Sequence, residues 1–494
     1  MKSRILFYIL TIFVALAISS CDDEDSFTVS PSNILTFSVD TVRLDTVFST
    51  VPSSTRSFWV YNKSGDGLRC NSVRLEHGNQ NGFRVNVDGV YLSPTSGYQV
   101  NDIEIRNKDS IRVFVELTSP TNNNGSPRKI EDNLVFALES GVQQKVNLNA
   151  YSWDADLMRN VRIYEDATIG NTSKPIVIYG GLTVAENATL TVAPGTTLYF
   201  HGDAGIDVQG RLVCAGTAEN NVVLRGDRLD LMFDYLPYDN VSGQWQGLRF
   251  HETSYDNRIS YTDIHSTFDG VVVDSSDVSK PTLTLEYSSI YNCQGTALSV
   301  TNSNVELRNT LLANTLNDCL YVDGGIVNMN NCTLAQFYPF DANRGVALRF
   351  SSLKYPLHQL TCRNSLITGY SQDELSAVHE DVEGNIFNFD FSNSIIRTPK
   401  IMTDDSLHFV NVVYEEYTDT VKAGAKHFRK IDIDNQRYDF SLDSISPAID
   451  KADVLTAEPL DITGSRRDDA PDIGAYEYKK EAMVPTKNRK IHRL

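Results

Sequence analysis

Acidic and imidazole side chains gather in the segment YTDIHSTFDG, residues 261–270, where they could transfer a proton or bind a metal ion. Asp263 and His265 flank Ile264, so in a strand that turns Ile264 inward both side chains point outward. Asp269 follows in the same segment, and His251 precedes it. The same residues also suit an ordinary surface hydrogen-bond network, and only the fold decides between the two interpretations.

A second set of residues bears on the cleavage of polysaccharides. Asp274 and Asp323 occupy equivalent positions two repeats apart, which predicts a separation of about 9.6 Å at about 4.8 Å per strand. A glycoside hydrolase needs two carboxyl groups about 5 to 9.5 Å apart, so this pair stands at the upper limit. A uronate lyase would use a basic side chain, for which Arg249 beside His251 is the best candidate. Ca²⁺ would then be its cofactor, and the sequence indicates no other.

The cysteines point to no metal site. Six of them follow Cys21, and none forms a Cys-x-x-Cys pair, so neither a zinc site nor a thioredoxin-like site is indicated. Most stand among apolar residues and are expected to be small buried side chains.

Short strands that recur at a fixed interval must position these groups. Leu182, Leu190, Leu198 and Ile206 stand eight residues apart, and Leu285, Leu307 and Met329 stand 22 apart, as do Ile290, Leu312 and Leu334. A period in the low twenties, built from short strands, indicates a solenoid with one turn per repeat. Because no helical periodicity is visible, the sequence predicts a parallel β-helix and not leucine-rich repeats.

Asparagine recurs at one corner of this repeat. Asparagine tolerates the left-handed backbone conformation that a sharp corner requires. We expect the stacked amides to bond to one another between coils, as in cross-β ladders. Tyr261 and Tyr287 take this place in earlier coils, so the ladder should span only the later ones, at Asn309, Asn331, Asn364 and Asn393.

Strand register also maps one outer face. The segments GLRFH, GVVVD, ALSVT, CLYVD and ALRFS align, which turns Arg249, Tyr321 and Arg349 outward. The two arginines, four coils apart, should be separated by about 19 Å. They are too distant to clamp one carboxylate, but they could bracket several units of an extended, acidic polymer.

Two insertions, 226–245 and 335–344, enter at one edge of this face and carry aromatic residues. Insertions in solenoids often lie on the binding face, so Tyr235, Tyr238 and Trp245 are candidate ligand-binding residues. The alternative is that such rings cover apolar edges of the coils.

The N-terminus has the pattern of a secretory signal. Lys2 and Arg4 precede an apolar run, residues 5–18, that is shorter than the roughly 20 residues needed to span a bilayer. The segment ISSC resembles a bacterial lipobox with a lipidated Cys21, and DDEDS resembles the export signal of Bacteroidota-type surface lipoproteins. This resemblance implies an outer-membrane lipid as partner and a location on the outer membrane, facing the exterior.

Composition and patterning complete the expected organisation. The 494 residues carry a formal charge of −19, which would repel a phosphate backbone and excludes nucleic acid as a partner.

Alternating runs such as IRVFVEL predict about seven half-buried strands in an immunoglobulin-like β-sandwich. The expected parts are the lipoprotein signal peptide 1–21, an acidic linker 22–30, the sandwich 31–156, the β-helix 157–445, a C-terminal capping motif 446–478 and a basic tail 479–494.

Two motifs carry a family resemblance. ENATLTVAPGTTLYF and the closing segment from SPAID to DIGAYEY resemble right-handed parallel β-helix surface lipoproteins of the pectate-lyase-like superfamily, which often carry an immunoglobulin-like domain. That fold hosts lyases, hydrolases, adhesins and inert scaffolds alike. We expect the terminal motif to cap the open end of the solenoid. Its matching residues are Ser446, Pro447, Asp450, Asp461, Gly464, Arg466, Asp472, Gly474 and Glu477.

Three functions follow from these features. The favoured hypothesis is a surface-anchored lipoprotein whose β-helix presents a non-catalytic glycan-binding or adhesion face. The alternative is an extracellular polysaccharide-degrading enzyme, either a lyase or a glycoside hydrolase. A purely structural surface component is the third. Convergence of acidic and basic side chains within one or two coils would favour the enzyme.

Overall fold

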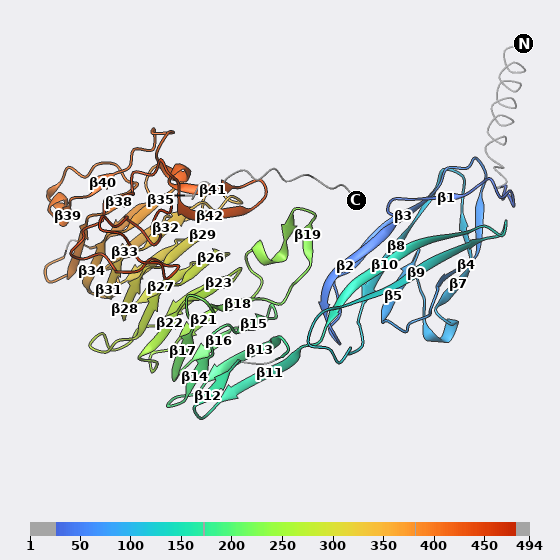
Figure 1. Cartoon of the computed structure of the whole chain (residues 1–494), viewed down its shortest axis with the longest axis horizontal. Helices are drawn as coiled ribbons and strands as arrows, with labels where there is room; N and C mark the ends of the chain where they lie inside the picture. The colour runs from blue at the N-terminus through green and yellow to red at the C-terminus, as the bar shows by residue number, and fades with distance from the viewer. Residues whose placement is uncertain (1–25, 171–172, 381, 481–494) are drawn as a thin grey trace, which may run out of the picture. The chain divides into compact units, whose positions relative to one another are not determined.

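The computed structural model describes residues 26–170, 173–380 and 382–480. The chain divides into two compact units, Met1–Asp154 and Ala155–Leu494, which are taken separately below. Nearly all regular elements are strands, first in a β-sandwich and then in a parallel β-helix (Figure 1). The predicted fold class is therefore confirmed. Cys21 and the predicted signal peptide lie outside the described residues.

Two five-stranded sheets enclose one apolar core in the first unit. The predicted alternation is visible on β8, where Ile111, Val113 and Val115 are buried while Arg112 and Phe114 are exposed. One sheet contains β1 (Leu35–Phe37), β3 (Arg56–Asn62), β8 (Ser110–Leu117), β5 (Phe83–Val87) and β6 (Val90–Tyr91). The other contains β2 (Thr41–Phe48), β10 (Gln143–Trp153), β9 (Arg128–Leu138), β4 (Leu68–Leu75) and β7 (Gln99–Ile105).

Three columns of parallel strands build the second unit. Face A is the ten-stranded sheet of β12 (Ala167–Ile169), β14 (Thr189–Val192), β17 (Arg211–Ala215), β22 (Asn257–Ser260), β25 (Leu283–Glu286), β28 (Asn304–Arg308), β31 (Gly325–Asn330), β34 (Leu357–Arg363), β37 (Phe387–Ser392) and β39 (Phe409–Val410). The remaining parallel strands form one 18-stranded sheet with two alternating columns, faces B and C. Its first strands, β11 (Asp156–Ile163) and β13 (Ile176–Val184), extend across both.

Faces B and C then continue coil by coil. Face B contains β15 (Thr197–Phe200), β18 (Val222–Gly226), β23 (Thr262–His265), β26 (Ser289–Cys293), β29 (Leu311–Thr315), β32 (Thr333–Gln336), β35 (Leu366–Gly369), β38 (Ile395–Ile396) and β40 (Val413–Tyr414). Face C contains β16 (Ile206–Val208), β21 (Leu248–Phe250), β24 (Val271–Val273), β27 (Leu298–Thr301), β30 (Leu320–Asp323), β33 (Leu348–Ser351) and β36 (Leu375–Val378).

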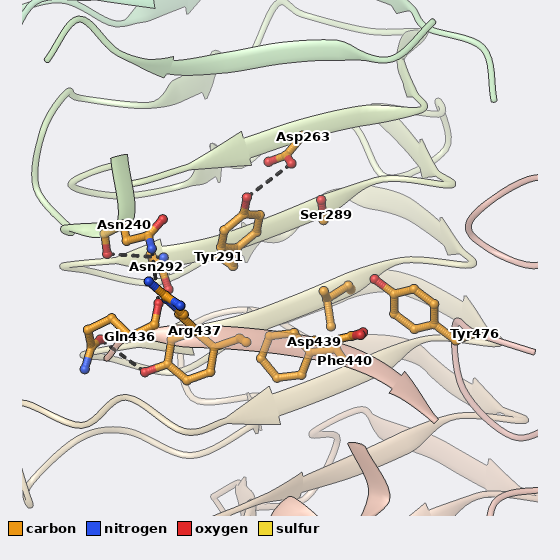
Figure 2. A pocket seen from close by; sticks show the side chains of 12 residues that line it. Asn240, Asp263, Ser289, Tyr291, Asn292, Gln436, Arg437, Asp439, Phe440 and Tyr476 are labelled. Atoms are coloured by element: carbon orange, nitrogen blue, oxygen red, sulfur yellow. Dashed lines mark hydrogen bonds between the residues drawn. The ribbon is translucent and has the colours of Figure 1, made fainter. Parts of the chain in front are cut away.

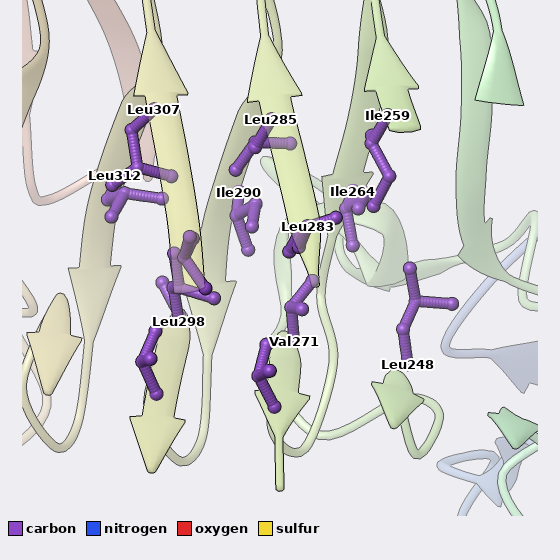
Figure 3. Close-up of a cluster of buried hydrophobic side chains, with 14 of the residues drawn as sticks. Leu248, Ile259, Ile264, Val271, Leu283, Leu285, Ile290, Leu298, Leu307 and Leu312 are labelled. Atoms are coloured by element: carbon purple, nitrogen blue, oxygen red, sulfur yellow. The ribbon is translucent and has the colours of Figure 1, made fainter. Parts of the chain in front are cut away.

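The 22-residue interval places side chains in columns, as predicted. Leu285 pairs with Leu307 and Leu307 with Met329 on face A. Figure 3 shows this stacking inside the solenoid, where the leucine, isoleucine and valine side chains of successive coils meet. The apolar side chains of all three faces thus fill one continuous core. Burying them removes apolar surface from water at roughly 25 cal/mol per Å², which stabilises each coil against its neighbours.

The asparagine corner between faces A and B is confirmed in its backbone. Asn309, Asn331, Asn364 and Asn393 have φ of 44°, 50°, 49° and 48°, and Tyr261 and Tyr287 have φ of 43° and 50°. The expected ladder does not form among these four amides, although the next corner residue, Asn411, donates its Nδ2 to Asn393 Oδ1 at 3.3 Å. Arg467 donates to Asn309 Oδ1, Glu458 N–H donates to Asn331 Oδ1, and Asp453 N–H donates to Asn364 Oδ1.

The C-terminal strap, residues 428–478, makes these contacts. It begins with the hairpin of β41 (Phe428–Asp432) and β42 (Arg437–Leu442) and packs Phe428, Phe440, Ile462 and Ile473 against outward side chains of face B. The predicted cap on the open end of the solenoid is therefore wrong, because the strap lies along the side of several coils. Five outward side chains of face B at β29, β32, β35 and β38 are apolar, which explains why the strap covers them: Leu311, Ala313, Ala335, Leu366 and Ile395.

The six described cysteines, at 70, 214, 293, 319, 332 and 362, are free thiols and all are buried, as expected for small apolar side chains. Burial raises the pKa of Cys214 to about 12. Across residues 26–170, 173–380 and 382–480, no helix has the length and apolar character to cross a membrane.

Candidate functional site

The structure separates the four residues of the predicted acid–imidazole cluster. Asp263 and His265 lie together on β23 of face B. His251 follows β21 on face C, where its ring lies 3.3 Å from Asp207 and 3.5 Å from Asp274. Asp269 Oδ1 accepts the backbone N–H of Thr296 at 3.1 Å. Because these groups are held in different places, they do not form one catalytic centre.

His265 is enclosed by carboxylates. Its Nδ1 lies 2.8 Å from Asp263 Oδ1 and its Nε2 lies 2.8 Å from Asp239 Oδ1. Arg225 pairs with Asp239 at 2.8 Å, so the four charges alternate along a chain. Burial lowers the pKa of His265, but the two carboxylates outweigh burial and bring this pKa to about 9. Both ring nitrogens are occupied, so His265 positions Asp263 and does not act as a base.

We expect stability to depend on pH through His265. Its pKa is about 9 in the folded protein and about 6.5 when unfolded, so its contribution is complete below pH 6.5 and is lost as pH rises through 9. The shift corresponds to about 3 kcal/mol of unfolding free energy. Urea unfolding at pH 6, 7.5 and 9 should show this fall in the wild type and a smaller one in His265→Gln. His251→Gln, at a histidine that is only partly buried, is the control. Equal pH dependence in wild type and His265→Gln would contradict the prediction.

The outward column of face C is present, but its arginines are already paired. Arg249 donates to both carboxylate oxygens of Asp274, at 2.9 and 3.0 Å. Arg349 donates to both oxygens of Asp318, at 2.8 and 3.2 Å. Tyr321 is half-buried between them on β30. Such bidentate pairs neutralise the guanidinium groups, so this column offers an acidic polymer little positive charge.

The predicted hydrolase pair also fails as an accessible site. Asp274 is held by Arg249 and lies beside His251, whereas Asp323 is buried and accepts a hydrogen bond from Ser351 at 2.9 Å. A carboxyl group without access to solvent cannot activate water, so the two aspartates do not flank a substrate. His251 and Asp274 instead line a polar cavity of about 410 Å³ with Glu186, Gln209 and Glu252.

The aromatic residues of the insertions differ in their exposure to solvent. Trp245, predicted to bind ligand, is fully buried: it stacks on Phe200 at 4.3 Å and its Nε1 donates to the His265 carbonyl. That prediction is wrong, because the ring is part of the core. Tyr238 supports the guanidinium of Arg228 at 3.6 Å. Tyr235, by contrast, is 46% exposed.

The exposed aromatic residues line a cavity of about 560 Å³. Tyr235 stacks with Phe233 at 5.8 Å on the hairpin of β19 (Leu231–Phe233) and β20 (Leu236–Pro237), and Phe340 lines the same cavity from the second insertion. Phe233 and Phe340 are 55% and 58% exposed. Residues 433–436 of the strap, between β41 and β42, complete its wall.

A second cavity, of about 420 Å³, lies on face B (Figure 2). It shares Gln436 with the first cavity. Asp263, Ser289 and Tyr291 come from successive coils, and the strap contributes Arg437, Asp439 and Tyr476. The Tyr291 hydroxyl donates to Asp263 Oδ2 at 3.2 Å. Both Asp263 and Asp439 therefore line one cavity, although they are 176 residues apart in the sequence.

Amide side chains connect the two cavities. Asn240 lies on the short 3-10 helix η2 (Tyr238–Asn240), and its Nδ2 donates to the Gln436 carbonyl, while Asn292 Nδ2 donates to the Asn240 carbonyl. Gln436 lines both cavities, and a narrow space of about 10 Å³ lined by Asn240, Asn292, Asn314 and Gln436 lies between them. We name the two cavities and this joint the side cleft.

Sequence reasoning missed most of the side cleft. Tyr235 was a candidate and Asp263 was proposed for another purpose, but the strap residues were not foreseen. Their one signal was the apolar outward pattern of face B at Leu311 and Leu366, which requires a cover. Within the described part of the chain, no group of three or more His, Cys, Asp or Glu side chains is placed to hold a metal ion.

No family model matches the sequence. A stretch of 64 residues, 13% of this chain, is 38% identical to part of the protein bark beetle of Drosophila melanogaster, and it spans 2% of that protein.

Two solved structures show weak likeness. The catalytic unit of a thermostable GH87 α-1,3-glucanase from Streptomyces thermodiastaticus aligns over 72% of this chain and 76% of that chain, with a TM-score of 0.30 and 12% identity. A family 123 glycoside hydrolase from Clostridium perfringens aligns over 24% and 26%, with a TM-score of 0.17 and 6% identity. Likenesses of this size transfer no activity to this chain.

Proposed function

We propose that this chain is a lipid-anchored surface protein whose β-helix binds an extracellular glycan in the side cleft. The observation that supports the proposal most is the combination of exposed rings at Phe233, Tyr235 and Phe340 with the amide and carboxyl groups beside them. Aromatic faces stack on the apolar faces of sugar rings, while amides and carboxylates bind hydroxyl groups. A concave site with these two components is the usual form of a small-molecule or oligosaccharide site.

The proposed site differs from the one expected from sequence. Arg249 and Arg349 of face C are engaged with aspartates, so neither guanidinium is free to bind an anionic ligand. The side cleft, in contrast, presents rings that are half exposed and polar groups from three separate segments. Affinity electrophoresis of residues 26–480 in gels that contain individual polysaccharides tests the proposal. Retarded migration in at least one gel is expected, and equal mobility in all of them would refute binding.

The surface anchor is proposed from the sequence alone. Lys2, Arg4, the apolar run 5–18 and Cys21 form the lipoprotein signal, and the acidic residues 22–25 form the export signal of a Bacteroidota-type surface lipoprotein. Outer-membrane lipid is then the partner of Cys21, and the protein faces the cell exterior.

Lipidation of Cys21 can be tested by labelling. Cells fed an alkyne-tagged fatty acid should label the wild-type chain, whereas Cys21→Ala should remove the label and release the protein from the membrane fraction. Protease added to intact cells should digest the labelled protein. Full labelling of Cys21→Ala would contradict lipidation, and protection from protease would contradict the outward orientation.

A second candidate function is hydrolysis of the bound glycan, because Asp263 and Asp439 line one cavity. Asp263 already accepts hydrogen bonds from His265 and Tyr291, which suits a fixed carboxylate. A lyase is less well supported, since its candidate base Arg249 is held by Asp274. New reducing ends in the retarding polysaccharide, abolished in both Asp263→Asn and Asp439→Asn, would establish the hydrolase.

A further inference from the structure

We infer that the side cleft takes a neutral glycan and excludes polyuronates. This inference rests on the proposed function and names the ligand class of the same site. The inference depends on the charged side chains that line the side cleft. The arginines of face C play no part in it.

The charges behind the carboxylate cavity cancel. Asp263 pairs with His265, which is an imidazolium at neutral pH, and His265 also pairs with Asp239. Arg225 pairs with Asp239 in turn. Two carboxylates and two cations therefore alternate, and each carboxylate has a cation within hydrogen-bonding distance. The Asp263 oxygens remain hydrogen-bond acceptors for hydroxyl groups, as the contact from Tyr291 shows.

The described residues that line the cleft add little positive charge. Arg437 is the single cationic side chain among them, and it stands two residues from Asp439 on β42. Asp434 adds another carboxylate at the aromatic end. A polyuronate carries one negative charge on each unit, so binding several units would need more cations than the cleft provides. Hydroxyl groups of neutral sugars, by contrast, donate well to carboxylate and amide oxygens.

A buried acceptor at the joint supports a ligand rich in hydroxyl groups. Asn314 Oδ1 is buried and has no hydrogen-bond partner, while the Nδ2 of the same amide donates to Asn292 at 3.3 Å. A buried acceptor without a partner is destabilising, and a donor from the ligand would offset this cost. The joint has room for a single hydroxyl group and not for a ring, so a sugar chain would cross its mouth and direct one substituent inward.

The cavity lined by exposed aromatic residues also suits a neutral glycan. Stacking of Phe233, Tyr235 and Phe340 on the faces of sugar rings does not require the sugar to carry a charge. The adjoining carboxylates at Asp434 and Asp439 would repel an anionic chain that reached across the cleft.

Affinity electrophoresis with matched polymers tests the inference. Gels would contain a β-1,3-glucan, a galactomannan or a xyloglucan as neutral polymers, and polygalacturonate or alginate as acidic ones. At least one neutral polymer should retard the wild type by twofold or more, and neither acidic polymer should. Retardation by an acidic polymer alone would overturn the inference while leaving glycan binding intact. Equal mobility in all gels would overturn both.

A charge-reversal variant shows whether polyuronates are excluded by electrostatic repulsion or because their shape does not fit the cleft. Asp434→Lys with Asp439→Lys should acquire retardation by polygalacturonate at low salt, lost at high salt. Asp404→Lys with Asp405→Lys changes the net charge equally, but on the 3-10 helix η3 (Asp404–His408) beside β37 and β39 of face A. This control should remain unretarded. Equal gains in both variants would show a nonspecific charge effect and overturn the role assigned to the cleft carboxylates.

Discussion

Replacing Arg467 by alanine is expected to lower the free energy of opening the C-terminal strap by about 3 to 5 kcal/mol, the usual cost of breaking a buried ion pair from one side. The guanidinium is almost fully buried and pairs with Glu477 at 3.0 Å. It also donates to Asn309 Oδ1 and to the carbonyls of Gly474 and Ala475. Its removal leaves the Glu477 carboxylate buried without its cation.

Native-state hydrogen exchange measures this effect. Amides of residues 446–478 should exchange at least a hundredfold faster in Arg467→Ala, while those of the first unit stay unchanged. The matched control is Arg466→Ala, which removes an exposed arginine at the adjacent position. Equal protection of the strap in the two variants would contradict the role of Arg467. Strap residues form part of the side cleft. Arg467→Ala should therefore also be retarded less than the wild type in gels that contain the glycan.

The second large effect concerns binding. Combining Phe233→Ala, Tyr235→Ala and Phe340→Ala should reduce glycan affinity about a hundredfold, since each stacked ring contributes about 1 kcal/mol and every 1.4 kcal/mol is tenfold. The three rings are half exposed, so their loss should leave the unfolding transition in place.

Tyr164→Ala is the matched control for the triple variant. Tyr164 is an exposed aromatic residue of the same unit that does not line either cavity of the cleft. Titration calorimetry with an oligosaccharide of the retarding polymer gives the two affinities. A loss of less than threefold in the triple variant, or an equal loss in Tyr164→Ala, would show that the glycan binds elsewhere.

The sequence predicts those parts of the fold that depend on a local backbone requirement or on a short repeat. The 22-residue interval placed Leu285, Leu307 and Met329 in one column because the coils between them have the same length. The corner asparagines were found because few residues tolerate φ near 50°. Both signals are contained within one or two coils.

The side cleft could not be predicted in this way, because its walls come from segments far apart in the chain. Asp263 and Asp439 line one cavity only when the strap folds back over face B, and strand register says nothing about where such a segment returns. The same limit explains Trp245, whose place in an insertion did not reveal that its ring joins the core. It also explains why Arg466 was named in the terminal motif, although the buried partner of Glu477 is Arg467.

The contacts between the strap and the corner residues also restrict how the solenoid can change in evolution. Gly464 lies against Tyr261, Arg467 reaches Asn309, and Glu458 N–H donates to Asn331. Duplicating or deleting one 22-residue turn between these points would shift the later anchors by about 4.8 Å and break their match with the strap. The number of turns from the coil of Ala218, which also lies against Gly464, to the coil of Asn364 is therefore fixed.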